Sequence, residues 1–263
     1  MNNAIYTFEN PVNEPVCQYG PGSVERDKML SELKRMADEQ VEIPLIIGGK
    51  EIRTGKTVNI ICPHDRSKSL GKYHLASVNE IRKACDAAIQ AKKEWEEIPW
   101  TERGMIMLKA AELLSKKYRY VINAATMLGQ SKNVFQAEID SACEVIDFLR
   151  YNSYYASLIY QNQPKPGVGQ INLLEYRPLE GFVFTVTPFN FTSIAGNLAT
   201  APALMGNTVI LKPASTAVLS VYYIVKILEE AEVAAESRLK DRLPEITPGI
   251  GVNKRPDLEA SSF

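Results

Sequence analysis

Two apolar runs of the chain each end in a short polar turn that could carry chemistry. Residues 181–187 (GFVFTVT) lead into Pro188-Phe189-Asn190-Phe191, and residues 208–211 lead into Lys212-Pro213-Ala214-Ser215. The amide NH2 of an asparagine at such a turn can donate to negative charge that develops on an oxygen atom, an interaction whose loss typically costs about 100- to 1,000-fold in rate. The Lys212 ammonium and the Ser215 hydroxyl could hold ribose hydroxyls or a phosphate.

Both turns also have ordinary structural explanations. Asn190 could cap a helix that begins just after it, and Ser215 could cap the next helix, while Lys212 could be a solvated side chain. From the chemistry of the residues alone, the cap is the better explanation of Asn190, and Ser215 could serve both roles.

The elements around these turns predict an α/β fold. The run 181–187 is typical of a strand buried on both faces. A helix is expected over 193–205 with Gly206 just past its end, then a strand over 208–211 and a helix that continues through Glu230. This β-α-β-α order opens a doubly wound, Rossmann-like parallel sheet, which binds ligands at the carboxyl ends of its strands. Neither a G-x-G-x-x-G nor a P-loop motif occurs in the chain.

The N-terminal part predicts helices and one hairpin. Helical spacing of apolar residues indicates helices over 24–40, from near Thr101, and over 134–160, and Ser77 with Glu80 forms a capping box for another. Gly48-Gly49 lies between two short apolar runs, which is a hairpin signal. The apolar stripe of the long helix is expected to face the core; its members are Ile139, Cys143, Ile146 and Leu149.

Composition narrows the class of protein. The chain has 30 lysines and arginines against 31 aspartates and glutamates, so no electrostatic footprint for nucleic acid or an anionic membrane is present. No apolar run is long enough to span a bilayer, and the N-terminus lacks the features of a secretory or mitochondrial leader, which favours a cytoplasmic protein. Four cysteines without C-x-x-C spacing and two histidines predict no metal site and free, buried thiols.

The run FTVTPFNFTSIAGNLATAPALMGNTVILKPAS resembles the aldehyde dehydrogenase superfamily, whose cofactor domain carries a P-[WF]-N-[FP] turn followed by G-N-x-[VI]-x-x-K-P. The form PFNFT is similar to the branch that oxidises glutamate semialdehyde, as are QAEID at 136–140, LLEYRPLEGFV at 173–183 and YGPGSVER at 19–26. The resemblance extends from about residue 15 to residue 231.

The resemblance implies a role for each matched residue. Asn190 corresponds to the asparagine that stabilises the oxyanion during attack on the aldehyde. Lys212 corresponds to a lysine that contacts the adenine ribose. Ser215 stands where many members carry a glutamate that binds ribose hydroxyls, so NAD is the expected cofactor and NADP is not excluded. Phe191 and Glu138 are expected to shape the aldehyde pocket. The strand end that lies along the cofactor comprises Thr185, Val186, Thr187, Pro188 and Phe189.

The implied activity is oxidation of L-glutamate gamma-semialdehyde to L-glutamate with NAD(P)+ in proline degradation. Because the resemblance ends near Ala231, the nucleophilic cysteine and the general-base glutamate are expected to be missing from the chain. The alternatives are a non-catalytic remnant and an aldehyde dehydrogenase for another substrate. An unfinished parallel sheet is also expected to leave an apolar edge uncovered.

The expected organisation has three parts. Residues 1–40 form an N-terminal arm and helix, residues 41–231 a partial cofactor-binding domain, and residues 232–263 a divergent tail. The run 171–177 (INLLEYR) is expected to be a strand that resembles part of the superfamily's oligomerisation flap, which implies a homo-oligomer for the complete enzyme.

Overall fold

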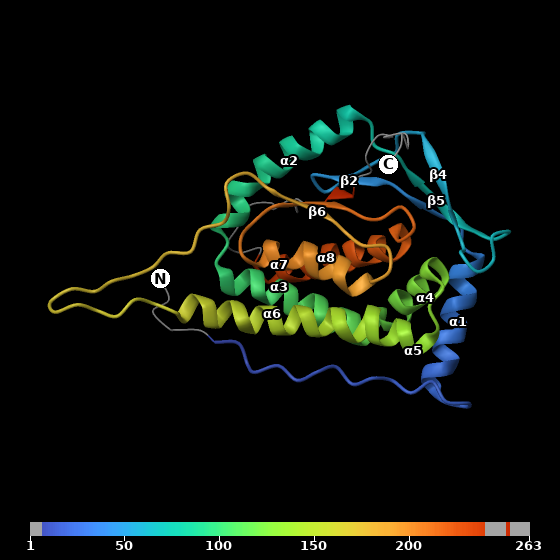
Figure 1. The fold of residues 1–263 in the computed structure, drawn as a ribbon, viewed down its shortest axis with the longest axis horizontal. Coiled ribbons are helices and arrows are strands. Elements are labelled where there is room, and N and C mark those ends of the chain that lie inside the picture. The colour runs from blue at the N-terminus through green and yellow to red at the C-terminus, as the bar shows by residue number, and fades with distance from the viewer. Residues whose placement is uncertain (1–6, 240–250, 253–263) are drawn as a thin grey trace, which may run out of the picture.

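A computed structural model describes residues 7–239 and 251–252 of the chain. Figure 1 shows α2 on one side of the short strands and the layer of α3, α6, α7 and α8 on the other. The helices are α1 Val24–Asp38, α2 Val78–Glu97, α3 Trp100–Leu113, α4 Arg119–Gln130, α5 Val134–Ala137, α6 Glu144–Gln161, α7 Thr192–Leu204 and α8 Val218–Leu239, with π-helical segments η1 Leu114–Tyr118 and η2 Glu138–Cys143. The predicted divergent tail lies outside the described residues, apart from the end of α8 and residues 251–252.

The strands form three small sheets. They are β1 Val41–Ile43, β2 Leu45–Ile47, β3 Lys50–Ile52, β4 Thr57–Ile61, β5 Ser69–His74, β6 Val183–Val186, β7 Val209–Lys212 and β8 Gly251–Val252. Their orders are β1-β5-β4, β2-β3 and β6-β7-β8. The predicted parallel sheet is confirmed, because β6 pairs in parallel with β7 and α7 connects them. The predicted hairpin is confirmed as β2-β3, where Gly48 and Gly49 have φ of +55° and +69°, values that favour glycine.

The predicted helices are present, but in the long helix over 134–160 one side chain that was expected to face the core faces solvent instead. The Ser77–Glu80 capping box is present at the start of α2. The long helix occupies the predicted range, but η2 interrupts it between α5 and α6. A π-helical turn holds more residues than an α-helical turn and therefore shifts which side chains face inward. As a result Glu138 and Asp140 are buried and Ile139 is exposed, so the prediction that Ile139 faces the core is wrong.

Two strand predictions are also wrong. No strand forms over 171–177; that segment belongs to an exposed extension, residues 163–179, seen at the left of Figure 1. A single bridge, between Gly167 and Gln170, lies in this extension just before the segment. Its apolar content suggested a strand, but a strand also needs a paired neighbour, and none lies beside it among the described residues. β6 is not buried on both faces, since Phe184 and Val186 are exposed while Thr185 is buried.

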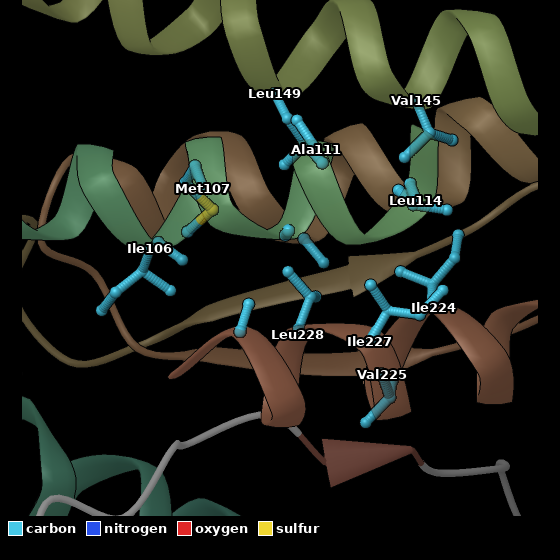
Figure 2. Close-up of a cluster of buried hydrophobic side chains, with 14 of the residues drawn as sticks. Ile106, Met107, Ala111, Leu114, Val145, Leu149, Ile224, Val225, Ile227 and Leu228 are labelled. Carbon is cyan, nitrogen blue, oxygen red and sulfur yellow. The ribbon is translucent and has the colours of Figure 1, made fainter. Parts of the chain in front are cut away.

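The main core joins the helical layer to the sheet. In Figure 2 the side chains of α3 and α8 point toward one another, and Val145 and Leu149 of α6 reach α3 from the other side. Leu211 of β7 belongs to the same cluster and has no exposed surface. Burial of each large aliphatic side chain contributes about 1.5–3 kcal/mol. This packing fixes β7, and through it the turn that carries Lys212.

Candidate functional site

The two predicted turns lie next to each other because their strands are paired. Val186 is the register partner of Lys212, and the Thr187 amide donates to the Lys212 carbonyl at 3.1 Å. Both turns leave the sheet at the carboxyl ends of parallel strands, where ligands bind in open α/β sheets. The segment Thr185–Phe189 therefore lies beside Lys212, as the cofactor prediction requires.

Asn190 is exposed at this edge and does not cap a helix. α7 begins at Thr192, and its N-cap residue, Phe191, makes no side-chain cap bond. The Asn190 side chain makes no hydrogen bond to any residue within 7–239. The cap explanation of Asn190 is therefore wrong, and its amide NH2 remains available for another acceptor.

The start of α7 is capped instead by Asp140, which comes from η2. The Asp140 carboxylate accepts from the amides of Thr192 (3.4 Å) and Ser193 (3.3 Å). The Lys132 ammonium lies 2.5 Å from the same carboxylate and 4.1 Å from the centre of the Phe191 ring, which is a cation–π geometry. Asp140 and Lys132 thus hold the turn on which Asn190 stands. Neither residue was among those predicted from the sequence, although Asp140 lies only two residues after Glu138.

Lys212 and Ser215 lie on the second turn. Lys212 is half-buried, and its ammonium donates to the Pro213 carbonyl at 3.3 Å. Ser215 is exposed, and α8 begins only at Val218, after Ala217, whose carbonyl accepts from the Val221 amide. Ser215 is therefore not at the N-cap position, and the cap explanation for it is also wrong.

Thr187 indicates that this edge is built to receive a polar ligand. Its hydroxyl is buried and has no hydrogen-bond partner among the described residues. Buried polar groups in native proteins are nearly always satisfied, so an unpartnered hydroxyl points to a missing partner. A dinucleotide offers ribose hydroxyls and phosphate oxygens that could satisfy Thr187, next to the cation of Lys212. The residues present fit such a cofactor.

Glu138 lies away from the exposed turn residues, in the protein interior. Its side chain is 0% exposed and forms an ion pair with Arg119. It also accepts from the Tyr19 hydroxyl (2.6 Å), the Asn123 amide (2.7 Å) and the Cys17 backbone amide (2.8 Å). Burial alone would raise the pKa of Glu138, but these donors lower it below the ordinary value. Glu138 has no surface with which to contact a substrate; it ties the N-terminal arm to the helices.

Glu144, four residues after Asp140, is a second carboxylate that the structure brings near the Asn190 turn. The Ser193 hydroxyl lies between the two carboxylates, 2.9 Å from Asp140 and 2.7 Å from Glu144. Glu144 is partly exposed, whereas Glu138 is not. The i, i+4 spacing of Asp140 and Glu144 on one helical face could have indicated this pair.

The four cysteines do not place a thiolate at the Asn190 turn. Burial is the main cause that raises the pKa of Cys143, to about 12, and it also raises that of Cys17. Cys62 is buried beside His64, whose ring accepts from or donates to the Ser131 hydroxyl at 2.9 Å. That pair lies in the turn after β4, in a different sheet from β6.

An apolar cavity lies at the other end of the strands, where β7 begins. Its lining includes Trp95, Met107, Thr208 and Val209. Thr208 precedes β7 and Val209 begins it, whereas Lys212 ends it, so the cavity is separated from the two turns by the length of the strand. It is not the site of the predicted chemistry.

Comparisons with known proteins agree on one family. A model of the aldehyde dehydrogenase family matches residues 51–237. A Schizosaccharomyces pombe protein named probable delta-1-pyrroline-5-carboxylate dehydrogenase is 50% identical over 227 residues, which is 85% of this chain and 41% of the relative. A human relative, named delta-1-pyrroline-5-carboxylate dehydrogenase, mitochondrial, is 44% identical over 219 residues, which is 83% of this chain and 39% of the relative.

A solved structure gives the same result for the fold. The delta-pyrroline-5-carboxylate dehydrogenase from Mycobacterium tuberculosis bound with NAD is 44% identical, has a TM-score of 0.88, and is matched over 96% of this chain and 45% of that one. The chain thus spans less than half the length of these relatives.

Proposed function

Because the chain belongs to the aldehyde dehydrogenase family, we propose that it supplies the oxyanion donor and part of the cofactor cradle for oxidation of L-glutamate gamma-semialdehyde to L-glutamate. The proposed aldehyde substrate and the link to proline degradation rest on the names of the relatives. The observation that carries the proposal is the pairing of Thr187 with Lys212, which puts the Asn190 turn and the second turn at one edge of the sheet.

Each residue of this edge has a proposed task. NAD, when bound, accepts the hydride; Thr185, Val186, Thr187, Pro188 and Phe189 would lie along it, and Lys212 and Ser215 would hold its ribose. The exposed amide of Asn190 would donate to the aldehyde oxygen as negative charge develops there. Phe191, held under the Lys132 ammonium, would form one wall of the aldehyde pocket. Glu138 would act only indirectly, through the packing of η2.

The cofactor preference is proposed to be relaxed. Ser215 carries no charge, so nothing at this position repels the 2′-phosphate of NADP, in contrast to a carboxylate that would. NAD remains the first expectation because the M. tuberculosis neighbour is bound to it.

Assembly and location follow from further observations. The extension at 163–179 exposes Ile171, Leu173 and Leu179, and apolar surface of this kind marks protein–protein contacts. It would serve as an oligomerisation flap between copies of the complete enzyme. A cytoplasmic location stays a prediction, because the human relative is named as mitochondrial. No helix within the described residues is long and apolar enough to cross a bilayer.

Nucleotide binding by the purified chain tests the proposal. We expect NAD+ to bind in calorimetric titration, and Lys212→Ala to weaken binding about tenfold or more, because a hydrogen bond to a charged group contributes about 1.5–3 kcal/mol. Lys116→Ala, which removes an exposed lysine paired with Glu112, is the matched control and should leave the affinity unchanged. An NAD+ affinity that is the same in both variants would remove Lys212 from the cradle.

Aldehyde oxidation by the chain alone is expected to be absent. The reaction needs a thiolate beside Asn190, and the four cysteines lie elsewhere, with the pKa of Cys17 and Cys143 raised. The measurement is NADH formation from glutamate semialdehyde and from succinate semialdehyde, compared with heat-killed protein. Turnover above that background would mean that one of the present thiols is a nucleophile, and Cys62→Ser would identify the pair with His64.

A further inference from the structure

Four polar side chains meet where α7 and α8 begin. They are Thr126 and Gln130 of α4, Thr192 of α7 and Ser220 of α8. The two threonines and the serine are at most 1% exposed, and Gln130 is half-buried. Because Thr126 and Gln130 are four residues apart on one helix, they lie on the same face of α4. That face therefore contacts both of the helices that follow the two candidate-site turns.

The hydrogen bonds among these side chains have a defined direction. The Gln130 amide nitrogen carries two protons and donates to Thr192 (2.8 Å) and to Ser220 (3.0 Å). The Thr192 hydroxyl donates to Ser220 at 3.0 Å, and the Ser220 hydroxyl donates to the Ala217 carbonyl at 3.3 Å. Thr126, 2.8 Å from Thr192, is then the donor in that pair, because each hydroxyl has one proton. A continuous set of hydrogen bonds therefore joins α4, α7 and α8.

This network connects the two turns of the candidate site. Thr192 lies two residues after Asn190, at the first position of α7. Ser220 lies five residues after Ser215, in the first turn of α8. The Gln130 amide nitrogen bonds both hydroxyls, whereas its Oε1 atom is buried and has no partner among the described residues. Within that part of the chain, the side chain of Gln130 thus bonds only the starts of these two helices.

We infer that Gln130 is a positioning residue that fixes the Asn190 turn relative to the turn that carries Lys212. The inference rests on the proposed function, because a bound dinucleotide would extend across both turns. The groups of a binding site must be held within about 0.5 Å by the packing and hydrogen bonds around them. The pairing of Thr187 with Lys212 holds the turns where they leave the sheet. Gln130 holds them where they enter their helices, so both ends of each turn are fixed.

The test compares the full chain with Gln130→Met, which keeps the length of the side chain and removes both N–H donors. In 15N-labelled protein without cofactor, we expect the side-chain amide resonance of Asn190 and the backbone amide resonance of Ser215 to shift. NAD+ binding in calorimetric titration should weaken about fivefold, which corresponds to the loss of one ordinary hydrogen bond. Circular dichroism establishes that the variant is folded under the conditions of both measurements.

Two further variants make the result specific. Ser220→Ala removes a single oxygen atom, the acceptor of Gln130 on α8, and should shift the same two resonances. Gln163→Met is the matched control. The Gln163 amide nitrogen also donates twice, to the Tyr160 carbonyl (3.0 Å) and the Leu174 carbonyl (3.2 Å), but it lies in the exposed extension. The control should leave both resonances and the NAD+ affinity unchanged.

Three results would contradict the inference. The first is unchanged turn resonances in both Gln130→Met and Ser220→Ala. The second is a lower urea midpoint for Gln130→Met with an unchanged NAD+ affinity, which would mean that Gln130 only stabilises the fold. The third is an equal loss of affinity in Gln163→Met. If the wild-type chain does not bind NAD+ while the resonances shift as expected, the proposed function fails, and the role of Gln130 in holding the two turns stands.

Discussion

Replacing Arg119 with methionine should lower the free energy of unfolding by about 3–5 kcal/mol, because it leaves the buried carboxylate of Glu138 without its counter-ion and that of Glu14 with Arg150 alone. Arg119 forms ion pairs with Glu138 and with Glu14 (2.5 Å), and it donates to the Pro15 carbonyl at 2.5 Å. All three charged side chains are buried. A loss of this size is a large part of the 5–15 kcal/mol that stabilises a typical domain.

Urea unfolding followed by circular dichroism measures this effect, and two variants make it specific. Lys117→Met removes a neighbouring but exposed ion pair with Glu230, and its midpoint should stay close to that of the wild type. The double variant Arg119→Met/Glu138→Leu should be less destabilised than the sum of the single changes, because an apolar pair can replace a buried ion pair. A loss below about 1 kcal/mol for Arg119→Met would show that the network contributes little to stability.

Replacing Asn190 with alanine should lower kcat for aldehyde oxidation by about 100- to 1,000-fold, because one oxyanion donor is lost. The enzyme for this measurement is the chain joined to the part of the S. pombe relative that follows the matched segment. Asn190 is exposed and takes no part in capping α7, so the variant should fold and bind NAD+ as the wild type does.

Asn172→Ala is the matched control, since Asn172 is an exposed asparagine on the extension, and its side chain donates a hydrogen bond to the Lys165 carbonyl there. It should retain full kcat. If Asn190→Ala kept more than about a third of the wild-type kcat, the oxyanion role would have to be assigned to another donor.

The features that the sequence predicted correctly are set by neighbouring residues. The Gly48-Gly49 hairpin and the Ser77–Glu80 capping box each depend on fewer than about six consecutive residues. The parallel pair β6-β7 follows from two apolar runs with a helix between them. These local sequence patterns were therefore enough to predict that Thr187 and Lys212 lie next to each other.

The features that the sequence could not predict depend on contacts between distant residues. Asp140 caps α7 from 52 positions away, and only the π-helical η2 turns it inward. Glu138 was assigned to the aldehyde pocket because its motif resembled the family, yet its partners Tyr19 and Arg119 lie 119 and 19 positions away and hold it in the interior. The strand prediction for residues 171–177 was wrong because apolar composition does not show whether a second strand lies beside the segment to pair with it.

The N-terminal arm has a consequence for synthesis on the ribosome. Residues 13 and 14 are translated early, yet some of their partners lie in the first two turns of α6: Asn13 and the Glu14 amide contact Asp147, and Glu14 pairs with Arg150. At about 5–20 residues per second, roughly 7–27 s pass before those partners emerge. During that time the contacts of the arm with α6 cannot form, so this part of the arm docks late in synthesis.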